Sequence, residues 1–438
     1  MRVYTEVAMD TNQLLQVISR ADVTPDERLD ALSSLSEKIR CGALKPDNSG
    51  EWVNNHIHTC YSFSPYTPAS AVYYAWKAGL KTAGIMDHDS VGGAEEFIRA
   101  GEIIRIPTTV GFECRVSVSD TILEGRRLNN PDQISCAYVA MHGIPHPSIA
   151  EAEKILAPLR VQRNCRNRRM CERITELVSP LGMVLDFDAD VLPISQYSRG
   201  GSVTERHILF ALVQKLISAY PNRQDAMSAV EKIIQMPLSE KNRTKLTEAP
   251  ENFYAYDLLG ILKSHMVERF YIDAAEECMH ITEFTALANR LGAISAYAYL
   301  GDVGESVTGD KKAQTFEDSF LEELFTEISG MGFCAVTYMP SRNTKEQLSR
   351  VMKLCDQHRL FQISGEDINS PRQSFICRAM EDVSFSHLTK ATYALIGHEI
   401  AGSAAMENAM FSDATQKRLP SLEQRIDYYS AIGGYIPI

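Results

Sequence analysis

Short apolar runs alternate with amphipathic stretches along most of this chain. The runs are rich in β-branched and aromatic residues, which favour strands, and the helical period returns between them. We expect strands at residues 83–86, 108–110, 137–141, 293–298, 334–338 and 360–364. We expect helices at residues 68–78, 316–330 and 344–358. Repeated strand–helix units imply a parallel sheet, either open or closed into a barrel.

Two parts of the chain depart from this alternation. Strand-like runs stop between about residues 214 and 291, and amphipathic helical patterns replace them. A helix is also predicted near the start, where Thr24 can cap it and Pro25 suits its first turn. We therefore expect a helical N-terminal extension (1–48), a first barrel part (49–213), a helical insertion (214–291), a second barrel part (292–380) and a C-terminal helical extension (381–438).

Composition and charge narrow the class of protein. Hydrophobic residues make up 45% of the 438 residues and charged residues 23%, as in ordinary globular proteins. The formal net charge of −12 argues against broad nucleic-acid binding, which depends on positive fields. We expect no membrane span and no secretory signal, since no apolar run approaches the roughly 20 residues that a span needs. The ten cysteines form no C-x-x-C pair, so we expect reduced thiols in a cytoplasmic protein.

Candidate metal ligands begin with His56 and His58. Residues two apart on a strand point to the same face, so both imidazoles would project together. Imidazole suits Zn, Fe, Ni or Cu, and neighbouring carboxylates extend the choice to Mn. Such a pair also occurs on surfaces and in cores, so it does not identify a metal site by itself.

Further ionisable residues stand in or just after predicted strands. Asp87 and His88 follow one apolar run, and Glu366 and Asp367 follow the last one. Glu113 lies inside a run that reads as a buried strand, where a carboxylate is costly unless it is paired or binds a metal. Barrel enzymes build their sites at the ends of strands. The alternatives are a polar turn that caps the next helix at 87–90 and a structural salt bridge at Glu113.

In their order, these motifs resemble those of the polymerase and histidinol phosphatase (PHP) family of phosphoesterases. The matching segments are H-I-H-T at 56–59, M-D-H-D-S at 86–90, G-F-E-C at 111–114 and S-G-E-D-I-N at 364–369. V-T-E-R-H-I-L at 203–209 and the arginine-rich stretch 163–173 extend the resemblance, which spans about residues 52–375. It implies an α/β fold, a distorted (β/α)7 TIM-like barrel with a helical insertion, holding up to three clustered metal ions.

The resemblance also implies a first metal site that is complete in this sequence. Its ligands would be His56, His58, Glu113 and Asp367. Two imidazoles and two carboxylates suit a divalent transition metal such as Mn, Zn or Fe, so we expect at least one such ion.

The other family sites are altered. Tyr299 and Asn369 stand where the family has histidines. His88 remains for a third site, and His142 lies near a strand from which another family histidine is missing. We therefore expect Tyr299 and Asn369 to face the substrate, and His88 and His142 to be candidates for additional metal ligands.

Basic residues provide candidate phosphate ligands. Guanidinium groups match phosphate oxygens in bidentate geometry, and the resemblance favours Arg166 or Arg169 for this role. Arg206 and His207 open the next predicted helix, whose dipole favours an anion. The alternatives are a solvated helix face for the arginines and a buried core position for His207.

The expected function is metal-dependent hydrolysis of a phosphomonoester or phosphodiester, such as a small nucleotide. A metal-activated water near Glu113 would attack phosphorus, with His88 or Asp87 near the leaving group and arginines neutralising charge. The alternative is a catalytically degenerate PHP barrel that binds a phosphorylated ligand or a protein partner, which Tyr299 and Asn369 favour. A different metal-dependent hydrolysis is a third hypothesis, because fold does not fix function.

Overall fold

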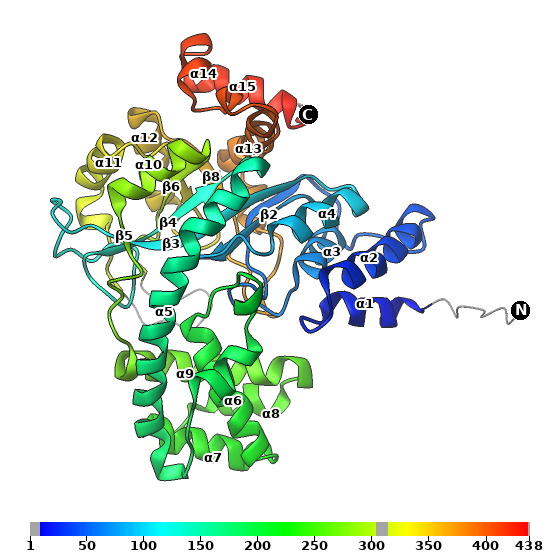
Figure 1. The fold of residues 1–438 in the computed structure, drawn as a ribbon, viewed down its shortest axis with the longest axis vertical. Coiled ribbons are helices and arrows are strands. Elements are labelled where there is room, and N and C mark those ends of the chain that lie inside the picture. Colours follow the sequence, from blue (N-terminus) through cyan, green and yellow to red (C-terminus); the bar gives the residue numbers. More distant parts are fainter. Residues whose placement is uncertain (1–8, 304–313, 437–438) are drawn as a thin grey trace, which may run out of the picture.

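A nearly closed sheet forms the centre of the molecule (Figure 1). The computed structural model describes residues 9–303 and 314–436. In spatial order the strands are β1 (Trp52–Ile57), β2 (Leu80–His88), β3 (Thr108–Ser117), β4 (Cys136–His142), β6 (Ile294–Ala298), β7 (Ala335–Tyr338) and β8 (Phe361–Ser364). Ile57 pairs with Ile368, and the side-chain amide of Asn55 donates to the Ser364 carbonyl at 2.8 Å. The two ends of the sheet therefore meet, and the predicted α/β barrel is confirmed.

One strand runs against the others. β4 is antiparallel to both β3 and β6, whereas the remaining neighbours in the barrel are parallel. The β3–β4 connection, residues 118–135, contains no helix. The chain therefore returns directly beside β3, without the crossover that a parallel strand requires. A two-residue strand, β5 (Met279–His280), also pairs with the end of β3.

The barrel helices are α3 (Pro68–Ala78), α4 (Ala94–Ile104), α10 (Ile281–Leu291), α11 (Leu321–Gly330) and α12 (Lys345–His358). The alternation predicts α3, α11 and α12, although α11 begins five residues after the predicted start at 316. No helix was predicted at α4, and α10 lies within the predicted helical insertion 214–291. The start of α12 follows from its capping box, in which the Thr344 side chain accepts from the Gln347 amide and the Gln347 side chain accepts in return. The six predicted strands coincide with observed strands or lie inside them, to within one residue at each end.

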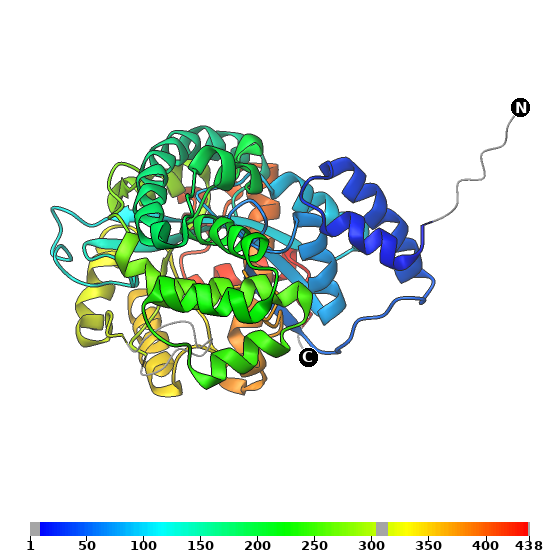
Figure 2. The same ribbon diagram turned by 90° about the horizontal axis from the view of Figure 1, so that it is seen from below.

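A second helical unit covers one end of the barrel. It contains the C-terminal part of α5 (Ile149–Val178), then α6 (Glu205–Ala219), α7 (Arg223–Ile234), α8 (Glu240–Glu248) and α9 (Glu251–Phe270). We call residues 163–270 the helical cap. Figure 1 shows it below the barrel, and Figure 2 shows it from that side. Its apolar core starts at Met170, before the predicted insertion 214–291, and includes Phe63 from the β1–α3 loop.

Helices at both ends of the chain pack on other parts of the barrel. α1 (Thr11–Ser19) and α2 (Pro25–Arg40) lie against α3 and α4, where Arg28 and Glu96 form a buried ion pair of 2.6 Å. α13 (Ser386–Ala404), α14 (Asp413–Arg418) and α15 (Leu422–Ile432) lie at the end of the molecule opposite the cap (Figure 1). A Cβ on Gly397 would stand 1.9 Å from the Tyr429 carbonyl, so α13 and α15 need glycine at this contact. None of the helices in residues 9–303 and 314–436 combines the length and apolarity of a membrane span.

Candidate metal centre

The end of β1 positions the first two candidate ligands. His56 and His58 flank Ile57, which is fully buried in the barrel wall. The Asn54 side chain accepts from the His56 amide at 2.9 Å, and the His58 amide donates to the Ile368 carbonyl at 3.0 Å. Backbone bonds thus fix both imidazoles beside the loop that follows β8.

Glu113 on β3 lies at the centre of the histidines. Its Oε1 stands 3.7 Å from His56 Nε2, 3.3 Å from His58 Nε2 and 3.1 Å from His88 Nδ1. Asp367, on the loop after β8, places Oδ1 3.2 Å from His58 Nε2. The structure therefore brings together the predicted ligands His56, His58, Glu113 and Asp367, with His88 beside them.

These separations are similar to the distances between neighbouring ligand atoms around one metal ion. Ligand atoms about 2.1 Å from a tetrahedral ion lie about 3.4 Å from one another. His58 Nε2 and His88 Nδ1 are also buried without a hydrogen-bond partner among the described residues. Buried nitrogens without partners are costly, and a cation between them and Glu113 would satisfy both. His56, His58 and Glu113 form a set whose candidate ligand atoms all lie within 4.8 Å of one another.

The electrostatics favour positive charge at this centre. Burial alone would raise the pKa of Glu113, but the surrounding histidines, led by His88 and His56, hold it well below its usual range. Burial would lower the pKa of His58, yet the neighbouring carboxylates of Asp367 and Glu113 raise it to about 10. Burial lowers the pKa of His88 to about 3, so this ring is neutral at physiological pH and able to act as a ligand.

Asp87 faces the β1–α3 loop. It is 1% exposed. Its carboxylate accepts from the Thr59 amide at 2.7 Å, from the Thr59 hydroxyl at 2.6 Å and from the Ser62 hydroxyl at 2.6 Å. The Ser62 oxygen lies 3.2 Å from His58 Nδ1. Asp87 thus supports His58 through Ser62. Both of its oxygens already accept hydrogen bonds within the protein, whereas a group that faces a leaving group would need a free oxygen.

His142, at the end of β4, is a separate buried histidine. Its Nε2 has no hydrogen-bond partner within the described parts of the chain. Burial, followed by repulsion from His56, lowers its pKa to about 3. It does not belong to the three-residue set around Glu113. Its predicted part in metal binding stays a prediction.

Tyr299 and Asn369, which replace family histidines, have different surroundings. The Tyr299 hydroxyl donates to Asp318 at 2.7 Å. The Asn369 side chain donates to Asp367 Oδ1 at 2.5 Å and accepts from Arg206. Asn369 therefore adjoins the candidate centre through Asp367, whereas the hydroxyl of Tyr299 is directed to another acidic partner.

Arg166 lies in a buried charge network between cap and barrel. Glu205 accepts from Arg115 at 2.8 Å, from Arg166 at 2.9 Å and from Arg163 at 3.2 Å. Arg166 also pairs with Glu277 at 2.5 Å. These carboxylates neutralise its charge, so a phosphate would have to compete with two ion pairs. The sequence did not indicate Arg115 or Glu205, because their partners are distant along the chain.

Two more of the predicted anion ligands, Arg169 and His207, differ in accessibility. Arg169 lies on the exposed side of α5. His207 is 2% exposed, its Nδ1 accepts from the Thr204 amide at 3.0 Å, and its ring meets Phe63 edge-on at 5.1 Å. This environment agrees with the core-histidine alternative, in which His207 helps to cap α6 and joins the β1–α3 loop to the cap.

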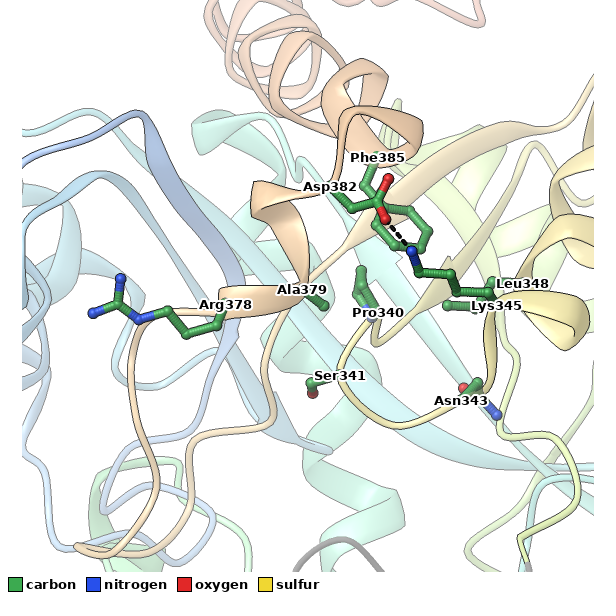
Figure 3. A pocket seen from close by; sticks show the side chains of 9 residues that line it. All are labelled: Pro340, Ser341, Asn343, Lys345, Leu348, Arg378, Ala379, Asp382 and Phe385. Carbon is green, nitrogen blue, oxygen red and sulfur yellow. Dashed lines mark hydrogen bonds and ion pairs between the residues drawn. The ribbon is translucent and has the colours of Figure 1, made fainter.

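A surface pocket lies close to the centre but is lined by other residues. Its volume is about 330 Å³, and it lies between the β7–α12 loop, the start of α12 and residues 378–385 (Figure 3). Lys345 pairs with Asp382 across it, and the side chain of Arg378 points away. Ser341 in its wall donates to Glu366 at 2.7 Å. The pocket therefore adjoins the residue before Asp367 and contains no predicted metal ligand.

Comparisons with known proteins find similar solved structures, among them a candidate phosphoesterase and an amidohydrolase. No protein-family model and no curated protein matches the sequence. A candidate metal-dependent phosphoesterase from Bifidobacterium adolescentis is 20% identical, over 78% of this chain and 96% of that one, with a TM-score of 0.49. An amidohydrolase from Chromobacterium violaceum, with bound sulfate and no metal, is 16% identical, over 74% and 89%, with a TM-score of 0.47.

Proposed function

We propose that this protein is a metal-dependent hydrolase of the PHP type that cleaves a phosphoester. The observation that carries the proposal is the surroundings of Glu113. Its carboxylate lies among three imidazoles, and His58 Nε2 and His88 Nδ1 are buried without hydrogen bonds in the described structure. A folded core tolerates such atoms when an ion or water satisfies them.

The metal ligands proposed are His56, His58, Glu113 and Asp367, with His88 beside them. Nitrogen and carboxylate donors together suit Zn²⁺, Mn²⁺ or Fe²⁺. When bound, such an ion polarises a phosphoryl oxygen and makes a coordinated water more acidic. The Asp367 side chain is 37% exposed, against 10% for Glu113, so the substrate would approach from the Asp367 side.

The chain's own groups have distinct parts in this proposal. Glu113 and Asp367 hold negative charge that balances the ion. His88 is neutral, and 23% of its side chain is exposed, so its Nδ1 can serve as a further metal ligand beside Glu113. Asp87 and Ser62 hold the ring of His58 in place, as outer-shell partners of metal-ligating histidines commonly do.

The second candidate function is a barrel that binds a phosphorylated ligand without turnover. The environment of Asn369 favours it: the amide nitrogen faces Asp367, and an amide nitrogen is not a metal ligand. A one-metal centre lacks the second cation that stabilises the leaving oxygen in two-metal sites.

One experiment separates the two functions. Protein grown with Mn, Fe and Zn is analysed for bound metal and assayed against nucleotides, sugar phosphates and short oligonucleotides. We expect about one tightly held ion per chain and a turnover that Glu113→Gln abolishes, while Glu346→Gln on the exposed face of α12 leaves both unchanged. Protein that retains no metal would refute the hydrolase function. Metal and phosphate binding without any turnover above the Glu113→Gln level would establish the binding function instead.

A further inference from the structure

We infer that Arg206 is the second cation of this centre, and that its guanidinium binds the phosphoryl oxygens of the substrate opposite the metal ion. The inference rests on the proposed function and adds a substrate class to it. The substrate would be a phosphoester dianion, bound between one metal ion and one arginine.

A short chain of hydrogen bonds places Arg206 beside the metal ligands. Its Nη1 donates to the Asn369 backbone carbonyl at 3.2 Å and also to the Asn369 side-chain oxygen. The Asn369 amide nitrogen donates to Asp367 Oδ1 at 2.5 Å, and this oxygen stands 3.2 Å from His58 Nε2. The guanidinium is therefore one amide group away from a candidate metal ligand.

Asn369 is itself held firmly. Its backbone amide donates to the Gln373 side chain at 2.7 Å. Farther along the same loop, Arg372 forms two hydrogen bonds of 2.6 and 2.5 Å with the buried Asp257 of α9. The loop that carries Asp367 and Asn369 is thus fixed to the helical cap, and Arg206 reaches it from the first turn of α6.

Arg206 differs from the neighbouring arginines in its charge balance. Arg115, Arg163 and Arg166 each form an ion pair with Glu205. Across residues 9–303 and 314–436, no carboxylate lies within 4.0 Å of the Arg206 guanidinium, since only the oxygens of Asn369 receive its hydrogen bonds. Its positive charge is therefore not neutralised, and Nε and Nη2 keep donors for a ligand.

The orientation of Asn369 explains why a guanidinium suits this position. A carboxylate at residue 369 would neutralise Arg206, and an imidazole could recruit a second metal ion. The amide does neither, because its oxygen faces Arg206 and its nitrogen faces Asp367. It orients the arginine and leaves its charge available. A guanidinium fork matches two phosphoryl oxygens, and fixed positive charge stabilises the negative charge of the transition state.

The test measures binding of inorganic phosphate and orthovanadate to Mn-loaded protein by calorimetry, next to metal content and turnover. Arg206→Ala should keep the metal content of the wild type and bind phosphate about 10- to 100-fold more weakly, as for loss of a hydrogen bond to a charged group. Arg206→Lys should fall between the two. Arg40→Ala, at an exposed arginine that ends α2, is the control and should bind as the wild type does.

Two further variants and a rescue make the test specific. Asn369→Asp should retain the metal and lose phosphate affinity, because the new carboxylate would neutralise Arg206. Guanidinium added at tens of millimolar should restore turnover to Arg206→Ala and leave Arg40→Ala unchanged. These variants keep the inference testable if Arg206→Ala does not fold.

The failures of the two proposals can be told apart. Wild-type phosphate affinity in Arg206→Ala and in Asn369→Asp, or two metal ions per chain in the wild type, would overturn the role of Arg206 and leave the hydrolase proposal standing. If the metal-loaded protein hydrolyses none of the tested esters while phosphate binding still depends on Arg206, the hydrolase proposal fails and the anion site stands.

Discussion

Asp87→Asn removes one buried negative charge from the support of His58 and hardly changes the size of the side chain. The carboxylate receives three hydrogen bonds of 2.6 to 2.7 Å, two from hydroxyls and one from an amide. In the variant, the side-chain oxygen can still accept from the Thr59 amide and from Ser62. The new amide group must face the Thr59 hydroxyl, which would have to turn and accept.

The expected magnitude follows from these bonds. A hydrogen bond to a charged group contributes about 1.5–3 kcal/mol and a neutral one about 0.5–1.5 kcal/mol, so three weakened bonds cost about 3 kcal/mol in all. Burial raises the pKa of Asp87, and removing the charge recovers part of that desolvation cost. We expect a net loss of about 1–2 kcal/mol in the free energy of unfolding.

The effect on the metal should be larger than on the fold. Without the charge of Asp87, Ser62 is held less firmly against His58 Nδ1, and loss of such an outer partner weakens metal binding about 10- to 100-fold. Competition with a chromophoric chelator measures the metal affinity, and chemical denaturation measures stability. Asp30→Asn on the exposed face of α2 is the control. A folded Asp87→Asn protein with wild-type metal affinity would refute the role assigned to Asp87.

Two other predictions use charges away from the barrel interior. Asp257→Asn should weaken the hydrogen bonds from Arg372 that hold the Asp367 loop to the cap. We expect the metal affinity to fall about tenfold while the barrel stays folded, and chelator competition would detect the loss. The hydrogen bond with Glu399 raises the pKa of His146, against the opposing effect of burial, so its stabilising effect is complete below the ordinary pKa of 6.5 and disappears as pH rises through the higher folded value. The melting temperature of the wild type should therefore exceed that of His146→Gln most at low pH, and a difference that grows with pH would contradict this.

Much of the barrel could be predicted because its strands are short apolar runs, which can be identified from the local sequence alone. The antiparallel direction of β4 could not be predicted. It depends on the helix-free connection at 118–135, and the polar sequence of this connection does not indicate where the chain runs. β1 contains two polar residues, Asn54 and Asn55, that interrupt its apolar run. The side-chain amide of Asn54 donates to a backbone carbonyl of the loop after β8, and that of Asn55 donates to a backbone carbonyl of β8 itself.

The candidate site was predictable to a similar degree. Strand periodicity and the order of motifs predicted that His56, His58 and Glu113 lie together, because each stands on or just beyond a strand. The partners of charged side chains were not predictable. Arg166 pairs with Glu205 and Glu277, which are 39 and 111 residues away in sequence, so its burial is invisible in the local pattern.

The metal centre at Glu113 is the central claim, and an anomalous difference map from crystals of Mn-loaded protein tests it most directly. We expect one strong peak, about 2.0–2.2 Å from Glu113 Oε1 and His58 Nε2, with His56 and Asp367 completing the set. The Glu113→Gln protein should lose this peak. A map of the wild type with no peak there, and with water on the histidine nitrogens instead, would contradict the account.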